Sequence, residues 1–127
     1  MDWKQAAAVI VGGGLGSFAR WGICQIPFLQ TQQNFPLPTF SVNMLGCFSI
    51  GYLYKMQEQG ILGNLLPLLL VTGFLGGFTT FSAFSLDFAL LVERKAYGHA
   101  LAYGAGSVAL SLIAVFAGLY LVRTLAS

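Results

Sequence analysis

The stretch that decides the fold is Thr72-Gly73-Phe74-Leu75-Gly76-Gly77-Phe78-Thr79-Thr80-Phe81-Ser82. It lies inside an apolar segment that extends from about residue 61 to residue 92. At about 1.5 Å per residue, one straight helix over that segment would exceed a hydrocarbon core of about 30 Å by roughly half. Glycines, hydroxyl side chains and β-branched threonines also make its middle a poor helix. We therefore expect two half-helices with an unwound stretch near residues 73–80.

An unwound backbone at membrane depth would itself create a binding opportunity. Such a break is tolerated only where it is buried in protein or lines a polar cavity. Carbonyls freed from helical bonding around Gly76 to Thr80 could coordinate a cation, as they do in the broken helices of transporters. If two copies of the chain presented these breaks to each other, the carbonyls would surround one point on the axis between them.

The composition places the whole chain in a membrane. Hydrophobic residues make up 57% of the 127 residues and charged residues only 8%, against about 25% charged residues in a typical soluble domain. Three further apolar segments, at residues 6–28, 38–54 and 99–122, approach the length that crosses a bilayer. We predict an all-α integral membrane protein, a single domain over residues 1–127, with four transmembrane helices of which the third is broken in mid-membrane.

The charged residues do not favour one orientation of the chain in the membrane. The net charge of +2 is too small to indicate a nucleic-acid partner. Three cations are expected on each side of the membrane: Lys4, Lys55 and Arg123 on one side, and Arg20, Arg94 and Lys95 on the other. Because an excess of Lys and Arg in cytoplasmic loops sets orientation, equal numbers allow the chain to insert both ways. Two opposed copies could then pair, which favours an antiparallel homodimer.

Small residues recur at a spacing of four in three of the apolar segments. The pairs are Gly12 with Gly16, Gly73 with Gly77, and Ala102 with Gly106. Such pairs let helix backbones approach closely in lipid, either within one chain or between two copies. The two cysteines, Cys24 and Cys47, lie in apolar surroundings, and we interpret both as small core residues. The first apolar run has no clear cleavage site, so we expect it to be retained as a span.

Polar residues inside the predicted spans are candidate functional residues, because they are expensive in lipid. Thr39 and Asn43 share a helix face, and Tyr103, Ser107 and Ser111 follow at successive steps of four. The serines could simply bond back to their own helix, with the tyrosine as an interfacial anchor. Alternatively, the stripe is a track of hydrogen-bond donors for an ion. Hydroxyl and amide donors, with no acidic run beside them, favour an anion.

Aromatic and basic residues allow two interpretations as well. Phe78, Phe81 and Phe84 fall three apart around the expected break, a pattern that packing alone explains. Their rings also have positive edges that could meet a small anion weakly, as conduction requires. Arg20 and Arg94, near span ends, could either concentrate anions by their field or extend to the interface as membrane anchors.

At these residues the sequence resembles the Fluc (CrcB) family of small dual-topology fluoride channels. The resemblance covers essentially the whole chain, and the motif at residues 72–85 is highly specific. The matching stretches are Gly14-Leu15-Gly16 with Arg20-Trp21, Asn43 with Gly46, residues 72–85, and the stripe of Tyr103, Ser107 and Ser111.

The resemblance implies a passive channel that exports toxic fluoride, with two pores in an antiparallel homodimer. The implied pore residues are Phe81 and Phe84, with Asn43 beside them, and a polar track of Thr39, Tyr103, Ser107 and Ser111. Arg20 would serve the aqueous vestibule.

The resemblance also implies a cofactor and a location. A central structural sodium ion at the dimer interface would take the carbonyls of Gly76 and Thr79 from each protomer. The location would be the inner membrane of a bacterium. Asp87 stands where family members are expected to carry a glutamate, which leaves its role open.

Three other classes of protein are alternatives. A small multidrug exporter needs a carboxylate inside a span, and the first span has none. A membrane enzyme is disfavoured because no zinc-protease motif, Cys–His pairing or carboxylate dyad occurs. A non-transporting assembly subunit would explain the glycines and the hydrophobicity, but not a broken segment beside a hydroxyl stripe.

Overall fold

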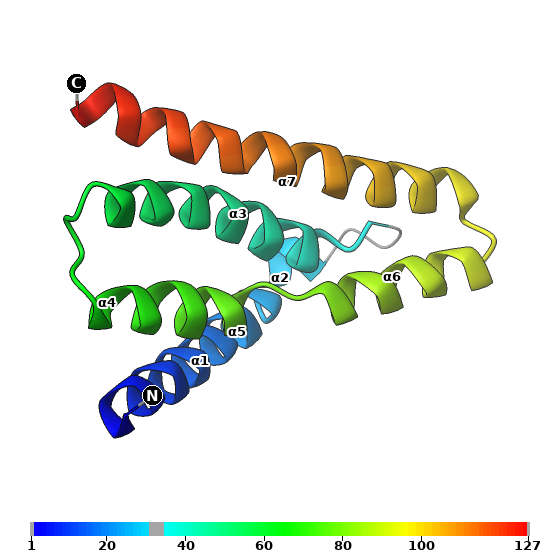
Figure 1. Ribbon diagram of the computed structural model, residues 1–127. Helices are drawn as coiled ribbons and strands as arrows, with labels where there is room; N and C mark the ends of the chain where they lie inside the picture. Colours follow the sequence, from blue (N-terminus) through cyan, green and yellow to red (C-terminus); the bar gives the residue numbers. More distant parts are fainter. Residues whose placement is uncertain (1, 31–34, 127) are drawn as a thin grey trace.

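The computed structural model describes residues 2–30 and 35–126, and every regular element in these ranges is helical (Figure 1). In chain order the elements are α1 (Trp3–Cys24), α2 (Pro27–Gln30), α3 (Leu37–Glu58), α4 (Leu65–Pro67), the π-helix η1 (Leu68–Leu75), α5 (Gly76–Phe78), α6 (Phe81–Glu93) and α7 (Tyr97–Ala126). Local sequence explains where the first helix begins. Asp2 caps the N-terminus of α1, and the Gln5 side chain bonds back to the Asp2 amide.

Three helical stretches in the described part of the chain are long and apolar enough to cross a membrane. They are Trp3–Cys24, Leu65–Glu93 and Tyr97–Leu125, so the chain is a multi-pass membrane protein. Helix α3 has 22 residues, which is also long enough. It is less apolar because polar residues such as Ser41, Asn43 and Ser49 lie along it. A fourth span at α3 therefore stays a prediction.

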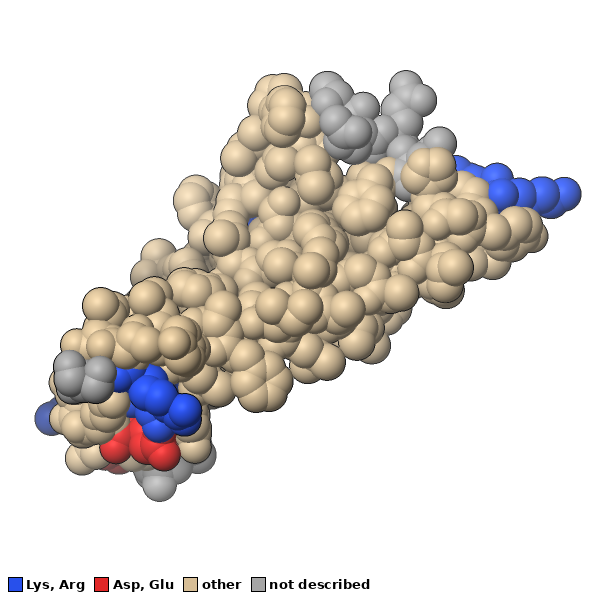
Figure 2. Space-filling view, turned by 90° about the horizontal axis from the view of Figure 1, so that it is seen from above, with Lys and Arg blue, Asp and Glu red and all other residues tan. Residues whose placement is uncertain are grey.

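The long elements alternate in direction. Helices α3 and α7 lie side by side and run the same way, whereas the segment from α4 to α6 runs the opposite way (Figure 1). Helix α1 crosses the η1 and α5 part of that segment obliquely, and the two described termini lie at the same end. Charged side chains gather mainly at the two ends of the elongated molecule, with an uncharged surface between them (Figure 2). That distribution suits a membrane-embedded middle.

Two of the three small-residue pairs pack helices within the chain. A Cβ atom on Gly12 would collide with the Leu69 carbonyl oxygen, and one on Gly16 with the Phe74 carbonyl oxygen. Gly73 faces Gly12 from η1, where a Cβ would lie 3.0 Å from the Gly12 Cα. By contrast, a Cβ on Gly106 would meet nothing within 4 Å in the described part of the chain. Gly106 thus makes no such close contact here.

The third apolar segment is interrupted at Thr79 and Thr80, where the backbone is extended. Their φ and ψ angles are −83° and 156° for Thr79, and −151° and 118° for Thr80. The range expected to be unwound, residues 73–80, is wider than the break itself. Residues up to Leu75 are π-helical and Gly76–Phe78 form a helical turn. Close packing on α1 holds these residues helical despite their poor intrinsic propensity.

Candidate functional site

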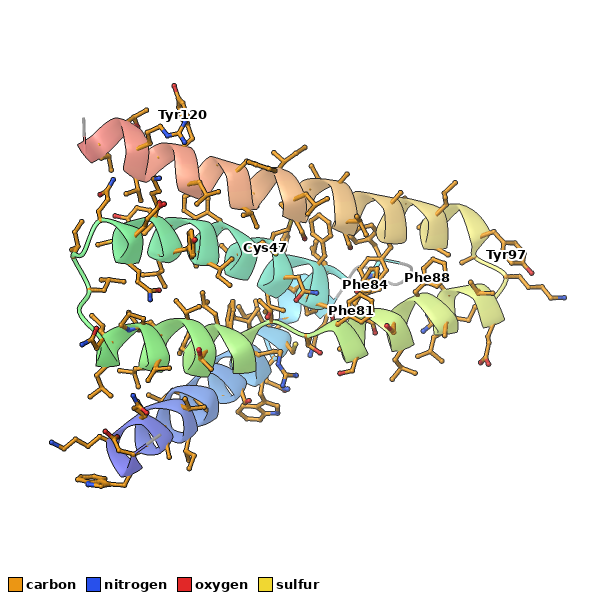
Figure 3. All side chains as sticks on the ribbon, in the orientation of Figure 1. Cys47, Phe81, Phe84, Phe88, Tyr97 and Tyr120 are labelled. Carbon is orange, nitrogen blue, oxygen red and sulfur yellow. The ribbon has the colours of Figure 1, made fainter. Side chains whose placement is uncertain are left out.

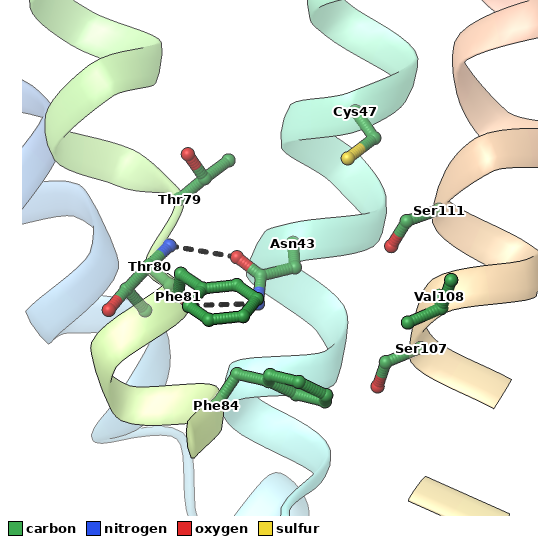
Figure 4. A pocket seen from close by; sticks show the side chains of 9 residues that line it. All are labelled: Asn43, Cys47, Thr79, Thr80, Phe81, Phe84, Ser107, Val108 and Ser111. Atoms are coloured by element: carbon green, nitrogen blue, oxygen red, sulfur yellow. Dashed lines mark hydrogen bonds between the residues drawn. The ribbon is translucent and has the colours of Figure 1, made fainter. Parts of the chain in front are cut away.

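The break is held open by one side chain of the neighbouring helix. The Asn43 Nδ2 donates to the Thr80 carbonyl oxygen at 3.1 Å, and the Thr80 amide donates to Asn43 Oδ1 at 2.8 Å (Figure 4). Thr80 Oγ1 in turn accepts from the Ala83 amide at 3.1 Å and caps the N-terminus of α6. Buried backbone groups must find such partners when a helix is broken. Asn43 thereby couples α3 to the geometry of the break.

A hollow of about 250 Å³ lies between α3, the break and α7 (Figure 4). Its lining residues are Asn43, Cys47, Thr79, Thr80, Phe81, Phe84, Ser107, Val108 and Ser111. These residues include four hydroxyls, one amide and one thiol, but no carboxylate and no Lys or Arg. The hollow therefore offers hydrogen-bond donors between apolar and aromatic walls.

The hydroxyls of the two serines of α7 differ in their hydrogen bonds. Ser107 is only 6% exposed, and its Oγ has no hydrogen-bond partner among the described residues. Ser111 Oγ donates to the Met44 sulfur at 3.8 Å, a weak acceptor. Leaving a buried hydroxyl unpaired costs about 1–3 kcal/mol. Ser107 thus brings to the lining of the hollow a hydroxyl that no described residue satisfies.

Tyr103, the third member of the hydroxyl stripe, is paired within the protein. Its ring is fully buried, and its hydroxyl donates to Asp87 Oδ2 at 3.2 Å. Thr39 on α3 is also buried, with 9% of its surface exposed. Tyr103 and Thr39 are not among the residues that line the hollow. The Phe84 ring connects the two places, because it lines the hollow and its centroid lies 5.1 Å from that of Tyr103.

The two phenylalanines at the start of α6 stand in different surroundings. Their ring centroids are 5.6 Å apart and the planes are tilted by 48°. Phe84 is half-buried, whereas Phe81 is 78% exposed although it lines the hollow (Figures 3 and 4). The hollow is thus open on the side of Phe81.

Arg20 lies at the break. The charge pattern of the sequence predicts it among the loop cations at one end of the molecule, and that position is wrong. Arg20 is half-buried, and its Nε donates to the Gly77 carbonyl oxygen at 3.0 Å. A guanidinium at the last turn of a half-helix donates a hydrogen bond to a free carbonyl. Its positive charge is also stabilised by the negative end of the helix dipole.

The carbonyls of Gly76 and Thr79 have lost the donors that a continuous α-helix would give them. In such a helix the amides four residues later, those of Thr80 and Ala83, would bond these oxygens. Here the Thr80 amide donates to Asn43 and the Ala83 amide donates to Thr80 Oγ1. Gly76 is also exposed. Two backbone oxygens without these helical bonds fit the ligand preference of a hard cation.

Cys47 and Thr80 belong to the site, but sequence reasoning assigns neither to it. The sequence favours Cys47 as a small core residue, yet it is half-buried and lines the hollow. Its position four residues after Asn43 on the same helix is a usable signal. Thr80 acts through backbone groups and a capping hydroxyl, for which side-chain spacing gives no signal.

Comparisons with known proteins identify the family of the chain. The family model described as CrcB-like protein, Camphor Resistance (CrcB), matches residues 7–119. The chain belongs to the CrcB-like family. A relative from Rhizobium etli, "Fluoride-specific ion channel FluC", is 48% identical over 95% of this chain and 98% of its own. Relatives of the same name come from Paracoccus denitrificans, 50% identical over 92% and 93% of the two chains, and Helicobacter pylori, 39% identical over 89% and 88%.

Proposed function

We propose that this chain is a passive, fluoride-selective ion channel, not an enzyme, and that it exports fluoride from the cytoplasm. The names of its CrcB-like relatives support the choice of ion. The observation that carries the proposal is the Ser107 hydroxyl, buried and, among the described residues, unpartnered at a hollow lined by further donors. Fluoride is a strong acceptor, and a donor with no other partner replaces part of its hydration.

The walls of the hollow suit passage more than tight binding. Donors from Ser107 and Ser111 stand opposite the rings of Phe81 and Phe84, whose edges carry partial positive charge. Conduction requires sites that are attractive enough to enter and weak enough to leave. The fluoride path would continue through Asn43 and past Phe84 to Tyr103 and Thr39. Arg20, half-buried at the break, would raise the local anion concentration in the vestibule.

The functional unit in this proposal is an antiparallel homodimer of four-span chains with two pores. The exposed Phe81 supports it, because one wall of the hollow is left uncovered by the chain's own helices. Gly106 of the small-residue pair Ala102–Gly106, where an added Cβ would meet nothing within 4 Å in the described chain, supplies a further surface for approach. In a bacterium the dimer would lie in the inner membrane.

A structural sodium ion would lie between the two breaks of this dimer. The carbonyls of Gly76 and Thr79 would hold it, since the amides that would otherwise bond them are engaged by Asn43 and Thr80. The ion would supply positive charge that keeps four carbonyl dipoles together. Asn43 and the Thr80 hydroxyl accept hydrogen bonds from the amides of Thr80 and Ala83, so these amides would not compete with the ion for the carbonyls.

A proton-coupled drug exporter is a poorer fit, because α1 carries no Asp or Glu between Trp3 and Cys24. The function can be tested by expressing the chain in bacteria that lack their own fluoride exporter and growing them on fluoride. We expect growth with the wild-type chain and poor growth with Phe81→Ile. Wild-type protein that reaches the membrane and still fails to protect the cells would contradict the proposal.

A further inference from the structure

The two cysteines of the chain are both free but differ in their surroundings. Cys47 lines the hollow, one helical turn after Asn43, and its sulfur is turned toward the side of Thr79 (Figure 4). Cys24 is the last residue of α1 and does not line the hollow. Both are half-buried, so the chain contains its own matched pair: one thiol at the hollow and one outside it.

An independent observation marks the space in front of Cys47 as a place for a ligand. Ser107, which also lines the hollow, is more than nine-tenths buried, and its hydroxyl lacks a partner in the described chain. Figure 4 shows Cys47 on α3 and Ser107 on α7, and both residues line the same hollow. Because both residues line this hollow, a group attached to Cys47 would reduce the space that is open to a ligand there.

We propose that Cys47 is a covalent modification site inside the ion passage, and that small thiol-reactive electrophiles close the passage by attaching to it. This inference rests on the proposed function, since it takes the hollow to be the path of fluoride. The half-burial of Cys47 leaves the thiol within reach of a reagent of a few atoms that enters the hollow.

The chemistry with a thiosulfonate is a simple exchange. Cys47 loses its proton to water, and the thiolate sulfur attacks the sulfenyl sulfur of methyl methanethiosulfonate. A new S–S bond forms, the S–S bond of the reagent breaks, and methanesulfinate leaves with the electron pair. The product is a methyl mixed disulfide on Cys47. A reducing thiol reverses the exchange and restores the free Cys47 thiol.

The test measures fluoride efflux from liposomes that contain the full-length protein, before and after methyl methanethiosulfonate. We expect the reagent to slow wild-type efflux by at least about tenfold, because conduction needs an open path. The Cys24→Ser variant should be blocked like the wild type. The Cys47→Ser variant should keep its own untreated rate, and dithiothreitol should restore flux to treated wild-type protein.

Intact mass and peptide mapping separate the outcomes. If Cys47 carries the methylthio group and efflux is unchanged, the thiol does not face the path and the inference is wrong. If the channel conducts but Cys47 stays unmodified, the thiol is not reachable from the passage, which also overturns it. Protein that shows no fluoride efflux even before treatment would contradict the proposed function itself. Block that persists in Cys47→Ser would place the sensitive group elsewhere and overturn the inference.

Discussion

Asn43 is the residue on which the geometry of the break depends. Its amide offers a donor and an acceptor at one point, which matches the carbonyl and the amide of a single peptide residue, Thr80. No hydroxyl or carboxylate side chain provides that combination in a fixed plane. The same residue also lines the hollow. A residue that supports the break and contacts the passage couples folding to function.

Replacing Asn43 by leucine should destabilise the protein. Leucine has a similar size, but both Thr80 groups would lose their partner at a cost of about 1–3 kcal/mol each. Thermal unfolding in detergent should show the loss. Leu45→Ala, an exposed position on the same helix, is the control. If the two variants unfold at the same temperature, Asn43 does not support the break.

Ser107→Ala separates a structural role of the hydroxyl from a transport role. Removing a hydroxyl that has no partner among the described residues should leave stability unchanged or slightly raised, because no bond to them is lost. Loss of one hydrogen bond to an anion costs about 1.5–3 kcal/mol, so fluoride efflux should fall about tenfold or more. A fluoride electrode and a thermal melt measure both quantities. Unchanged efflux from the variant would exclude Ser107 from the path.

At the scale of the elements, glycines fix how α1 crosses the broken segment. Gly16→Ala should destabilise the chain by about 1–3 kcal/mol, as overpacking does, because its Cβ would meet the Phe74 carbonyl. Gly14 lies on another face of the helix, where an added Cβ would meet nothing within 4 Å in the described part of the chain. Gly14→Ala should therefore be neutral or mildly stabilising. Equal effects of the two substitutions in a thermal melt would contradict this packing.

Sequence reasoning predicts the elements better than their contacts. Helices and a break in the third apolar segment follow from hydropathy, length and poor propensity. The expectation that residues 73–78 unwind is wrong, because helix propensity does not include the packing of Gly73 against Gly12. The hydroxyl stripe is regular in sequence, but only Ser107 and Ser111 line the hollow. Tyr103 is withdrawn from it by a bond to Asp87, a partner 16 positions away in sequence that spacing could not identify.

At the scale of the whole molecule, the placement of cations permits a test of dual topology. The start of α1 and the ends of α3 and α7, which carry Lys4, Lys55 and Arg123, lie at one end of the molecule (Figure 1). The junction between α6 and α7, which carries Arg94 and Lys95, lies at the other end. Replacing Arg94 and Lys95 by glutamine should bias insertion to one orientation, because cytoplasmic loops retain Lys and Arg. That variant alone should give little fluoride flux, since opposed copies would be scarce.

Co-expression with an oppositely biased variant should restore the flux. The complementary variant replaces Lys4, Lys55 and Arg123 by glutamine, and it too should conduct poorly when expressed alone. Fluoride uptake by inverted membrane vesicles measures all three cases. Full activity of either biased variant alone would be incompatible with an antiparallel pair.

The central claim is most directly tested by halide efflux from liposomes that contain the purified protein. One preparation is loaded with fluoride and another with chloride, and an ion-selective electrode follows release after a potassium ionophore is added. We predict rapid release of fluoride, little release of chloride, and slow release of fluoride from the Phe81→Ile variant. Fluoride release no faster than from protein-free liposomes, by protein shown to be folded, would contradict the account.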